Sequence, residues 1–440
     1  MIKNFLINRF NILSFLLLVI LLSAFRNISV IYYLIVVVCF GILFTSAFRN
    51  NSLPSGFIAS VFYIFFFYSI WIICWSAIYM QSLDFLPGIP RLFLVLVFTL
   101  CVLLFARKEK HFKTLLRISL FSYVLAALSV IYQIIFGEIS WFAPQFMRAK
   151  LDRYASILGS LTIYGSIVGY GLVMVYSSLL VEKKLLLKIV LFFILLTGAF
   201  FSLSKSGIVM IVLSFAVYLL FDFKSIIQRA NLKSVFFLMS ILIVITILLF
   251  QVDVFRLYYH SIVHQTLGPD SILSKGSIVI QNCEVYVCNQ FGNYNIYMDS
   301  PEVTFEEISR RLFYWTSQML KEYGNIVYFT GVGLQGGAGT LGITNAGVHY
   351  LSAHNGLGDL FFIGGTPYLL IFLVLFCSTQ IVFIRNKNDL LCRLFFMLNL
   401  LFFANLLVAS GSVFHPAISL PFWISTVYAN IKNNSYNSES

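Results

Sequence analysis

Residues 56–80 read GFIASVFYIFFFYSIWIICWSAIYM and contain no charged side chain. A helix needs roughly 20 apolar residues to cross the hydrocarbon layer of a bilayer, and this stretch is long enough. The whole chain of 440 residues is 60% hydrophobic and 10% charged, with 47 Phe and a mean hydropathy of +0.92. Soluble domains carry about 25% charged residues. The composition therefore excludes a soluble enzyme, a disordered chain and a disulfide scaffold, and it predicts a protein embedded in lipid.

Similar apolar stretches recur along the whole chain, and their lengths predict an all-α polytopic membrane protein with about 12 transmembrane helices. The expected spans are Phe10–Ala24, Ile28–Phe44, Gly56–Met80, Leu92–Ala106, Ile118–Phe136, Thr162–Leu180, Leu187–Phe201, Gly207–Phe221, Val235–Phe250, Leu360–Ile384, Leu394–Ala409 and Ala417–Ile431.

Basic residues are distributed unevenly over the loops between these spans. With the N-terminus in the cytoplasm, cytoplasmic segments hold 18 of the 29 Lys and Arg residues, whereas the short segments of the opposite side hold six. This bias follows the positive-inside rule and predicts that both ends of the chain are cytoplasmic. The net charge of +12 is thereby explained as a topology signal, and we expect no nucleic-acid partner.

The spans divide the chain into three parts. We expect spans 1–9 in residues 1–251, a large periplasmic loop between spans 9 and 10 in residues 252–355, and spans 10–12 with a cytoplasmic tail in residues 356–440. Within the loop, Ser300-Pro301-Glu302 is typical of a helix start and Gly324 of a helix stop, so an amphipathic helix is predicted over about 301–323. Cys283 and Cys288 also lie in the loop, where an oxidising compartment would permit a bridge that the sequence does not fix.

The candidate chemistry is concentrated on the periplasmic side. Arg148, Arg153 and Lys205 lie in two short segments there, and the long loop ends at Ala353-His354-Asn355-Gly356. A histidine at this boundary can be structural, or it can be a general base because its ordinary pKa is about 6.5. No Cys or carboxylate cluster accompanies it, so we expect no metal. Glycines from Gly331 onward lack the P-loop pattern and predict a flexible loop near the membrane.

Several of these motifs resemble the O-antigen polymerase and O-antigen ligase superfamily of bacterial inner-membrane glycosyltransferases. The topology agrees with that family, although the family often has Ser-Arg where this chain has Ser204-Lys205. The motifs that carry the resemblance are His354-Asn355 followed after nine residues by Gly365-Thr366-Pro367-Tyr368, then Arg311-Leu-Phe-Tyr-Trp315 with Gly331-Val-Gly333, and Arg153 followed by Gly159-Ser-Leu-Thr162 and Tyr164-Gly165.

The resemblance implies an enzyme that transfers a glycan from undecaprenyl diphosphate to a lipid-linked repeat unit at the periplasmic face, with no cofactor. Arginine forks suit a diphosphate, so Arg153 and Arg311 are assigned to it, with Arg148 and Lys205 as weaker candidates. His354 is the expected base, and the expected supporting residues are Asn355, Trp315, Gly331 and Gly333. A chain-length regulator is a further possible partner.

Three alternatives stay open at this point. A ligase that moves the finished glycan to lipid A–core would share the same site. A glycolipid flippase or transporter would also have about twelve spans, but such chains more often show internal repeats and charges inside the spans. The external carboxylates Asp84 and Asp152 compete with His354 for the role of the base.

Overall fold

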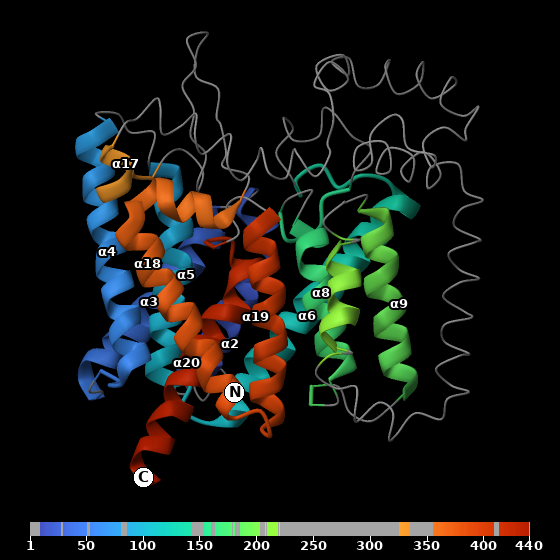
Figure 1. Ribbon diagram of the computed structural model, residues 1–440. Coiled ribbons are helices and arrows are strands. Elements are labelled where there is room, and N and C mark those ends of the chain that lie inside the picture. The colour runs from blue at the N-terminus through green and yellow to red at the C-terminus, as the bar shows by residue number, and fades with distance from the viewer. Residues whose placement is uncertain are drawn as a thin grey trace, which may run out of the picture.

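The fold was analysed in a computed structural model of the chain (Figure 1). It describes residues 9–27, 30–50, 53–80, 86–142, 154–159, 163–177, 179–180, 185–202, 207, 209–218, 220, 325–334, 355–408 and 413–439. These residues form helices and connecting turns, without strands. The helices are α2 (Arg9–Leu21), η1 (Ser23–Asn27), α3 (Val30–Asn50), α4 (Phe57–Met80), η2 (Leu86–Gly88), α5 (Ile89–Phe105), α6 (Glu109–Phe136), α8 (Ile163–Tyr176), α9 (Leu185–Phe201), α17 (Ile326–Phe329), α18 (Gly356–Arg385), α19 (Leu390–Val408) and α20 (Pro416–Glu439).

The expectation of an all-helical membrane protein is confirmed at this level. Four helices of the described residues are long and apolar enough to cross a membrane, at Phe57–Ile78, Glu109–Phe136, Gly356–Arg385 and Leu390–Leu407. Six shorter apolar helices accompany them, including the unlabelled helix Val209–Tyr218 after α9. Apolar side chains cover the outside of these helices, as on Phe67 and Leu186, which are 66% and 74% exposed. A surface of this kind needs a lipid environment. The count of twelve spans stays a prediction, because the span expected at 235–250 lies outside the described residues.

The long helices run roughly side by side, so the bundle has two ends (Figure 1). We call the end that carries α17 and the start of α18 the upper end. The other, at which both chain termini are marked, is the lower end. Twelve of the fourteen described Lys and Arg residues lie toward the lower end, and the two at the upper end are Arg26 and Arg91. The charge asymmetry expected from the sequence is therefore present in the folded bundle.

An aromatic seam joins α4, α18 and α20. The rings of Phe65 and Tyr368 stack with centroids 4.4 Å apart, and Trp423 lies 5.5 Å from Phe65. The Tyr368 hydroxyl is 2.8 Å from Ser69 Oγ, so its one polar group is satisfied inside an apolar environment. Large buried rings with a satisfied hydroxyl fix the relative positions of helices. This seam supports the part of α18 that leads to the candidate site.

A second seam joins α6, α8, α9 and α19 through small residues and polar contacts. A Cβ added to Gly198 of α9 would lie 2.8 Å from the Cα of Ala127 in α6, so the two backbones are in close contact. Asn405 of α19 donates to the Ser166 carbonyl and the Tyr170 hydroxyl of α8, both at 2.9 Å. Small residues and interhelical hydrogen bonds are the usual means by which helices associate in lipid.

Candidate functional site

The first feature of the site is the beginning of α18. Asn355 caps this helix with extended backbone angles, and its Oδ1 accepts a hydrogen bond from the Gly358 N–H at 2.5 Å. Asp359 lies in the first turn, where its charge is favoured by the helix dipole, and it is only 2% exposed. His354 directly precedes the cap in the sequence and lies outside the described residues. Asn355 therefore fixes the start of α18, and its expected role in a site stays a prediction.

The second feature is a break in α18 at Gly365. This residue has φ +73° and ψ −174°, which are not helical, and Pro367 follows within the same helix. A break of this kind frees backbone carbonyls that must find other donors inside an apolar bundle. The Gly364 carbonyl accepts from the Tyr68 hydroxyl of α4 at 3.0 Å. The two carbonyls before it accept from a different part of the chain.

That part is the segment Gly331–Leu334 of the long loop, which packs against the break. The Val332 N–H donates to the Phe362 carbonyl at 2.7 Å, and the Gly333 N–H donates to the Ile363 carbonyl at 3.1 Å. All four residues of the segment are buried. The expectation of a flexible loop is therefore wrong at these positions, because the carbonyls freed in α18 hold the segment in place.

Glycine is required twice in this segment. Gly331 and Gly333 have φ values of +68° and +83°, in the left-handed region that other residues rarely adopt. A Cβ on Gly331 would lie 2.5 Å from the Ile363 carbonyl oxygen, and one on Gly333 would press into Ser76 of α4. The Gly331 carbonyl also accepts from Trp75 Nε1 at 3.1 Å. These glycines allow the backbones of this segment, α4 and α18 to meet, and their expected supporting role in a site stays a prediction.

A third feature, which the sequence did not reveal as a site, is a cationic group at the upper end. We use the name upper cationic group for Arg26 of η1, Arg91 in the first turn of α5 and His415 directly before α20. Both arginines act electrostatically on His415, and Arg26 also acts on Arg91. Thr99 and Thr426 line one small cavity between α5 and α20. Arg91 precedes Thr99 by eight residues, and His415 precedes Thr426 by eleven. At 1.5 Å per helical residue, Arg91 and His415 lie about 12 and 16 Å above the cavity, so α5 and α20 begin at a similar depth.

The position of Arg91 in the upper cationic group opposes ordinary helix electrostatics. A cation is unfavourable at a helix N-terminus, where the dipole is positive, yet Arg91 lies in the first turn of α5. Nδ1 of His415 is buried and has no hydrogen-bond partner among the described residues. Burial, followed by the charges of Arg91 and Arg26, lowers the pKa of His415 well below its ordinary value. Two arginines that act on each other at one end of an apolar bundle are a candidate site for an anion.

The segment that follows Arg153 in the sequence reaches the same end. The Ala24 N–H in η1 donates to the Ile157 carbonyl at 3.0 Å, Ser23 Oγ donates to the Leu158 carbonyl, and a Cβ on Gly159 would lie 3.1 Å from Ala24 N. Residues 154–159 are therefore fixed against the short helix that carries Arg26. The sequence motif around Gly159 thus marks a contact with η1.

The structure accounts for the predicted site residues only in part. Asn355, Gly331 and Gly333 are described, and they lie along the first part of α18 and its break. The others fall outside the described residues, namely Arg148, Arg153, Lys205, Arg311, Trp315 and His354, as do the predicted helix over 301–323 and the Cys283–Cys288 pair. Within the described part of the chain, no cluster of three or more His, Cys, Asp or Glu side chains could hold a metal.

Comparisons with known proteins add no assignment. No known protein-family model and no curated protein matches this chain. The function is therefore argued from the residues and the geometry above.

Proposed function

We propose that this chain is an O-antigen polymerase that transfers a growing glycan from undecaprenyl diphosphate to a lipid-linked repeat unit. The observation that carries the proposal is the upper cationic group. It brings Arg26, in the last turn of η1, and Arg91, in the first turn of α5, together with His415 before α20, at the end of the bundle opposite the other described basic residues (Figure 1). A donor with a lipid tail and a diphosphate matches both properties, because the tail requires a membrane and the diphosphate requires cations.

The reaction needs one proton transfer and one charged leaving group. The acceptor hydroxyl attacks the anomeric carbon, the bond from that carbon to the diphosphate oxygen breaks, and the hydroxyl proton passes to a base. We assign the base to His354, which directly precedes the Asn355 cap. Arg153 and Arg311 are assigned to the leaving diphosphate, with Arg148 and Lys205 as weaker contributors. These cations balance the charge in our scheme, which assigns no role to a metal.

The remaining residues have supporting roles in this proposal. Gly331 and Gly333 allow this part of the long loop to pack against the break in α18, so in our scheme they hold it at the bundle. Trp315 lies one turn after Arg311 in the predicted loop helix and would pack beside it. The buried Asp359 side chain is one turn from the Asn355 cap and five residues after His354 in the sequence.

The membrane and orientation also belong to the proposal. The predominance of basic residues at the lower end supports a cytoplasmic lower end and a periplasmic upper end in the bacterial inner membrane. Both termini would then be cytoplasmic, because α2 begins and α20 ends at the lower end (Figure 1). The acceptor is a second lipid-linked repeat, and a chain-length regulator is a plausible partner.

The proposal is tested by donor binding and by turnover of the purified chain in lipid nanodiscs. We expect Arg26→Gln and Arg91→Gln each to weaken binding of undecaprenyl diphosphate about tenfold, because each removes a charge-assisted contact. Arg107→Gln removes the same charge at the lower end and is the matched control. Equal binding by all three variants would remove the upper cationic group from the site.

Turnover tests the roles proposed from the resemblance. Arg153→Ala and Arg311→Ala should insert normally but make no polymer, and the matching Lys variants should restore activity poorly if the diphosphate contact is bidentate. His354→Ala should lower the rate by about 10²–10⁴-fold while retaining donor binding. Polymerisation near the normal rate in His354→Ala, with Asp84→Asn or Asp152→Asn inactive, would transfer the role of base to a carboxylate.

A further inference from the structure

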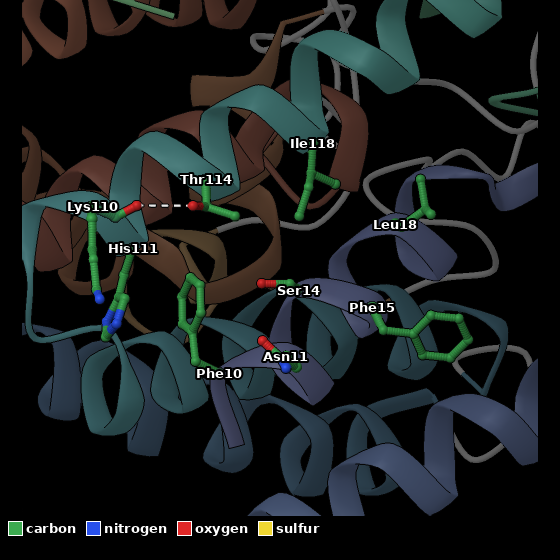
Figure 2. A pocket seen from close by; sticks show the side chains of 9 residues that line it. All are labelled: Phe10, Asn11, Ser14, Phe15, Leu18, Lys110, His111, Thr114 and Ile118. Carbon is green, nitrogen blue, oxygen red and sulfur yellow. Dashed lines mark hydrogen bonds between the residues drawn. The ribbon is translucent and has the colours of Figure 1, made fainter. Parts of the chain in front are cut away.

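A cavity of about 580 Å³ lies between α2 and α6, far from the candidate site and at the opposite end of the bundle (Figure 2). Its position is fixed by contacts at the lower ends of these helices. The rings of Phe10 and His111 stack with centroids 4.0 Å apart, and the Arg9 guanidinium lies 6.0 Å from the Phe105 ring. A cavity of this volume is in the range of small-molecule sites. Nothing in the proposed transfer reaction uses it.

The cavity is polar at one end and apolar at the other. Figure 2 shows Lys110 and His111 at one side, Asn11 and Ser14 near the middle, and Phe15 and Leu18 at the far side. Phe15 is 40% exposed on the outside of the bundle, so the apolar end is open to lipid. This gradient matches a molecule that has a polar head and a hydrocarbon tail.

The polar end has hydrogen-bonding and charge capacity that the described part of the protein leaves unused. Ser14 Oγ and His111 Nδ1 are buried and have no hydrogen-bond partner among the described residues. Lys110 forms no ion pair with a described residue, because the adjacent Glu109 is already paired with Lys113 at 2.6 Å. A buried polar atom without a partner is costly, and rotation of the Ser14 or His111 side chain toward a phosphate in the cavity would give it a partner, while the phosphate balances the charge of Lys110.

We propose that this cavity binds an anionic phospholipid of the surrounding bilayer. The phosphate would lie between Lys110, His111 and Ser14, and an acyl chain would follow Phe15, Leu18 and Ile118 out of the bundle. Basic pockets between transmembrane helices are the usual sites for anionic headgroups. The lipid would join α2 to α6, and this inference does not depend on the polymerase proposal.

The test is lipid retention by the full-length protein, measured by native mass spectrometry after purification from mixed phosphatidylglycerol and phosphatidylcholine. We expect preferential retention of phosphatidylglycerol. Lys110→Gln should weaken that retention about fivefold, the usual effect of one lysine near a lipid phosphate. Lys387→Gln, an exposed lysine at the same end but outside the cavity, is the matched control and should retain phosphatidylglycerol normally.

Two further measurements separate a lipid from other ligands and from a folding defect. Ser14→Leu places a branched apolar side chain in the middle of the cavity and removes the unpartnered hydroxyl, so the protein should fold normally but lose the retained lipid. Free glycerol 3-phosphate should fail to displace phosphatidylglycerol, because it lacks the acyl chain. Equal retention of both lipids, loss of retention in Lys387→Gln to the same extent as in Lys110→Gln, or full displacement by glycerol 3-phosphate would each overturn the proposal.

Discussion

The contact between Gly331 and α18 predicts that a side chain at this position lowers the stability of the protein in two ways, by backbone strain and by steric overlap. The two causes can be measured separately. Gly331→Ala places a Cβ in a left-handed conformation at φ +68° and 2.5 Å from a backbone oxygen that belongs to a buried helix. The strain costs about 1–2 kcal/mol. Moving the segment to relieve the contact would also weaken the hydrogen bonds of Val332 and Gly333, at about 0.5–1.5 kcal/mol each. We expect a total loss of about 2–5 kcal/mol in the free energy of unfolding.

Three other glycines provide the controls. Gly137 has φ +96° with nothing within 4 Å of an added Cβ, so Gly137→Ala reports strain alone and should cost about 1–2 kcal/mol. Gly364 is helical, but its Cβ would lie 2.6 Å from the buried Tyr368 side chain, so Gly364→Ala reports steric exclusion alone, at about 1–3 kcal/mol. Gly41→Ala, in a helix with open space, should be neutral or slightly stabilising.

The assay is reversible unfolding in mixed micelles, with glycan polymerisation measured in parallel. Gly331→Ala should be the least stable of the four variants and should lose polymerisation, whereas Gly41→Ala should keep both properties. If Gly331→Ala is no less stable than Gly137→Ala, the segment yields without resistance and the proposed closure onto the break in α18 is wrong.

Three further predictions concern the two ends of the bundle. Burial alone would raise the pKa of Asp389, but hydrogen bonds from Lys432 and from the Cys392 and Leu391 N–H groups lower it below the usual value. Asp389→Asn should therefore cost about 1–3 kcal/mol of stability at pH 7. The stability difference between the two proteins should shrink as the pH falls below about 3.9, the pKa of an Asp in the unfolded chain. The pKa of His415 is also lowered, so below about pH 6.5 the unfolded chain binds more protons at this residue than the folded chain does. Stability should therefore fall as the pH drops below about 6.5. His415→Gln should make the dependence of stability on pH weaker in this range. A cysteine introduced at position 293 should react with an impermeant thiol reagent in intact spheroplasts if the long loop is periplasmic.

Each of these predictions has a defined contrary result. For Asp389, the comparison is Glu109→Gln, which breaks the more exposed ion pair to Lys113 and should cost no more than about 1 kcal/mol; a larger loss there than in Asp389→Asn would contradict the reasoning. For His415, an unchanged pH slope in the Gln variant would show that the histidine is not the group that titrates. For position 293, labelling only after lysis would reverse the orientation.

Much of the helical architecture could be predicted because it depends on apolar stretches that are local in the sequence. The uncharged stretch at residues 56–80 became α4 within one residue of its expected start. The expected span Leu360–Ile384 became α18, which begins four residues earlier because Asn355 caps it. Helix ends depend on single residues that cap a helix or interrupt it, and a hydropathy profile does not identify such residues.

The candidate site could be predicted only where a short motif carried it. Gly331-Val-Gly333 was recognised as a motif, but its role required two left-handed glycines and carbonyls freed by a break in a distant helix. Arg26 and Arg91 were visible in the sequence only as exceptions to the charge bias. Their closeness to His415 depends on how three separate helices pack, and no local pattern encodes that. The unusual feature was an arginine, Arg91, in the first turn of a helix. It can indicate a site only when the helix boundaries are known.

The central claim is that this chain lengthens a glycan on a lipid diphosphate, and reconstitution tests it most directly. Purified chain in proteoliposomes is supplied with an undecaprenyl diphosphate-linked repeat unit, and the lipid-linked products are separated by length. We predict a ladder of longer glycans that remain on the diphosphate lipid and that disappear in His354→Ala. Movement of labelled lipid across the bilayer without lengthening, or transfer of glycan only when lipid A–core is supplied, would contradict the proposed polymerase.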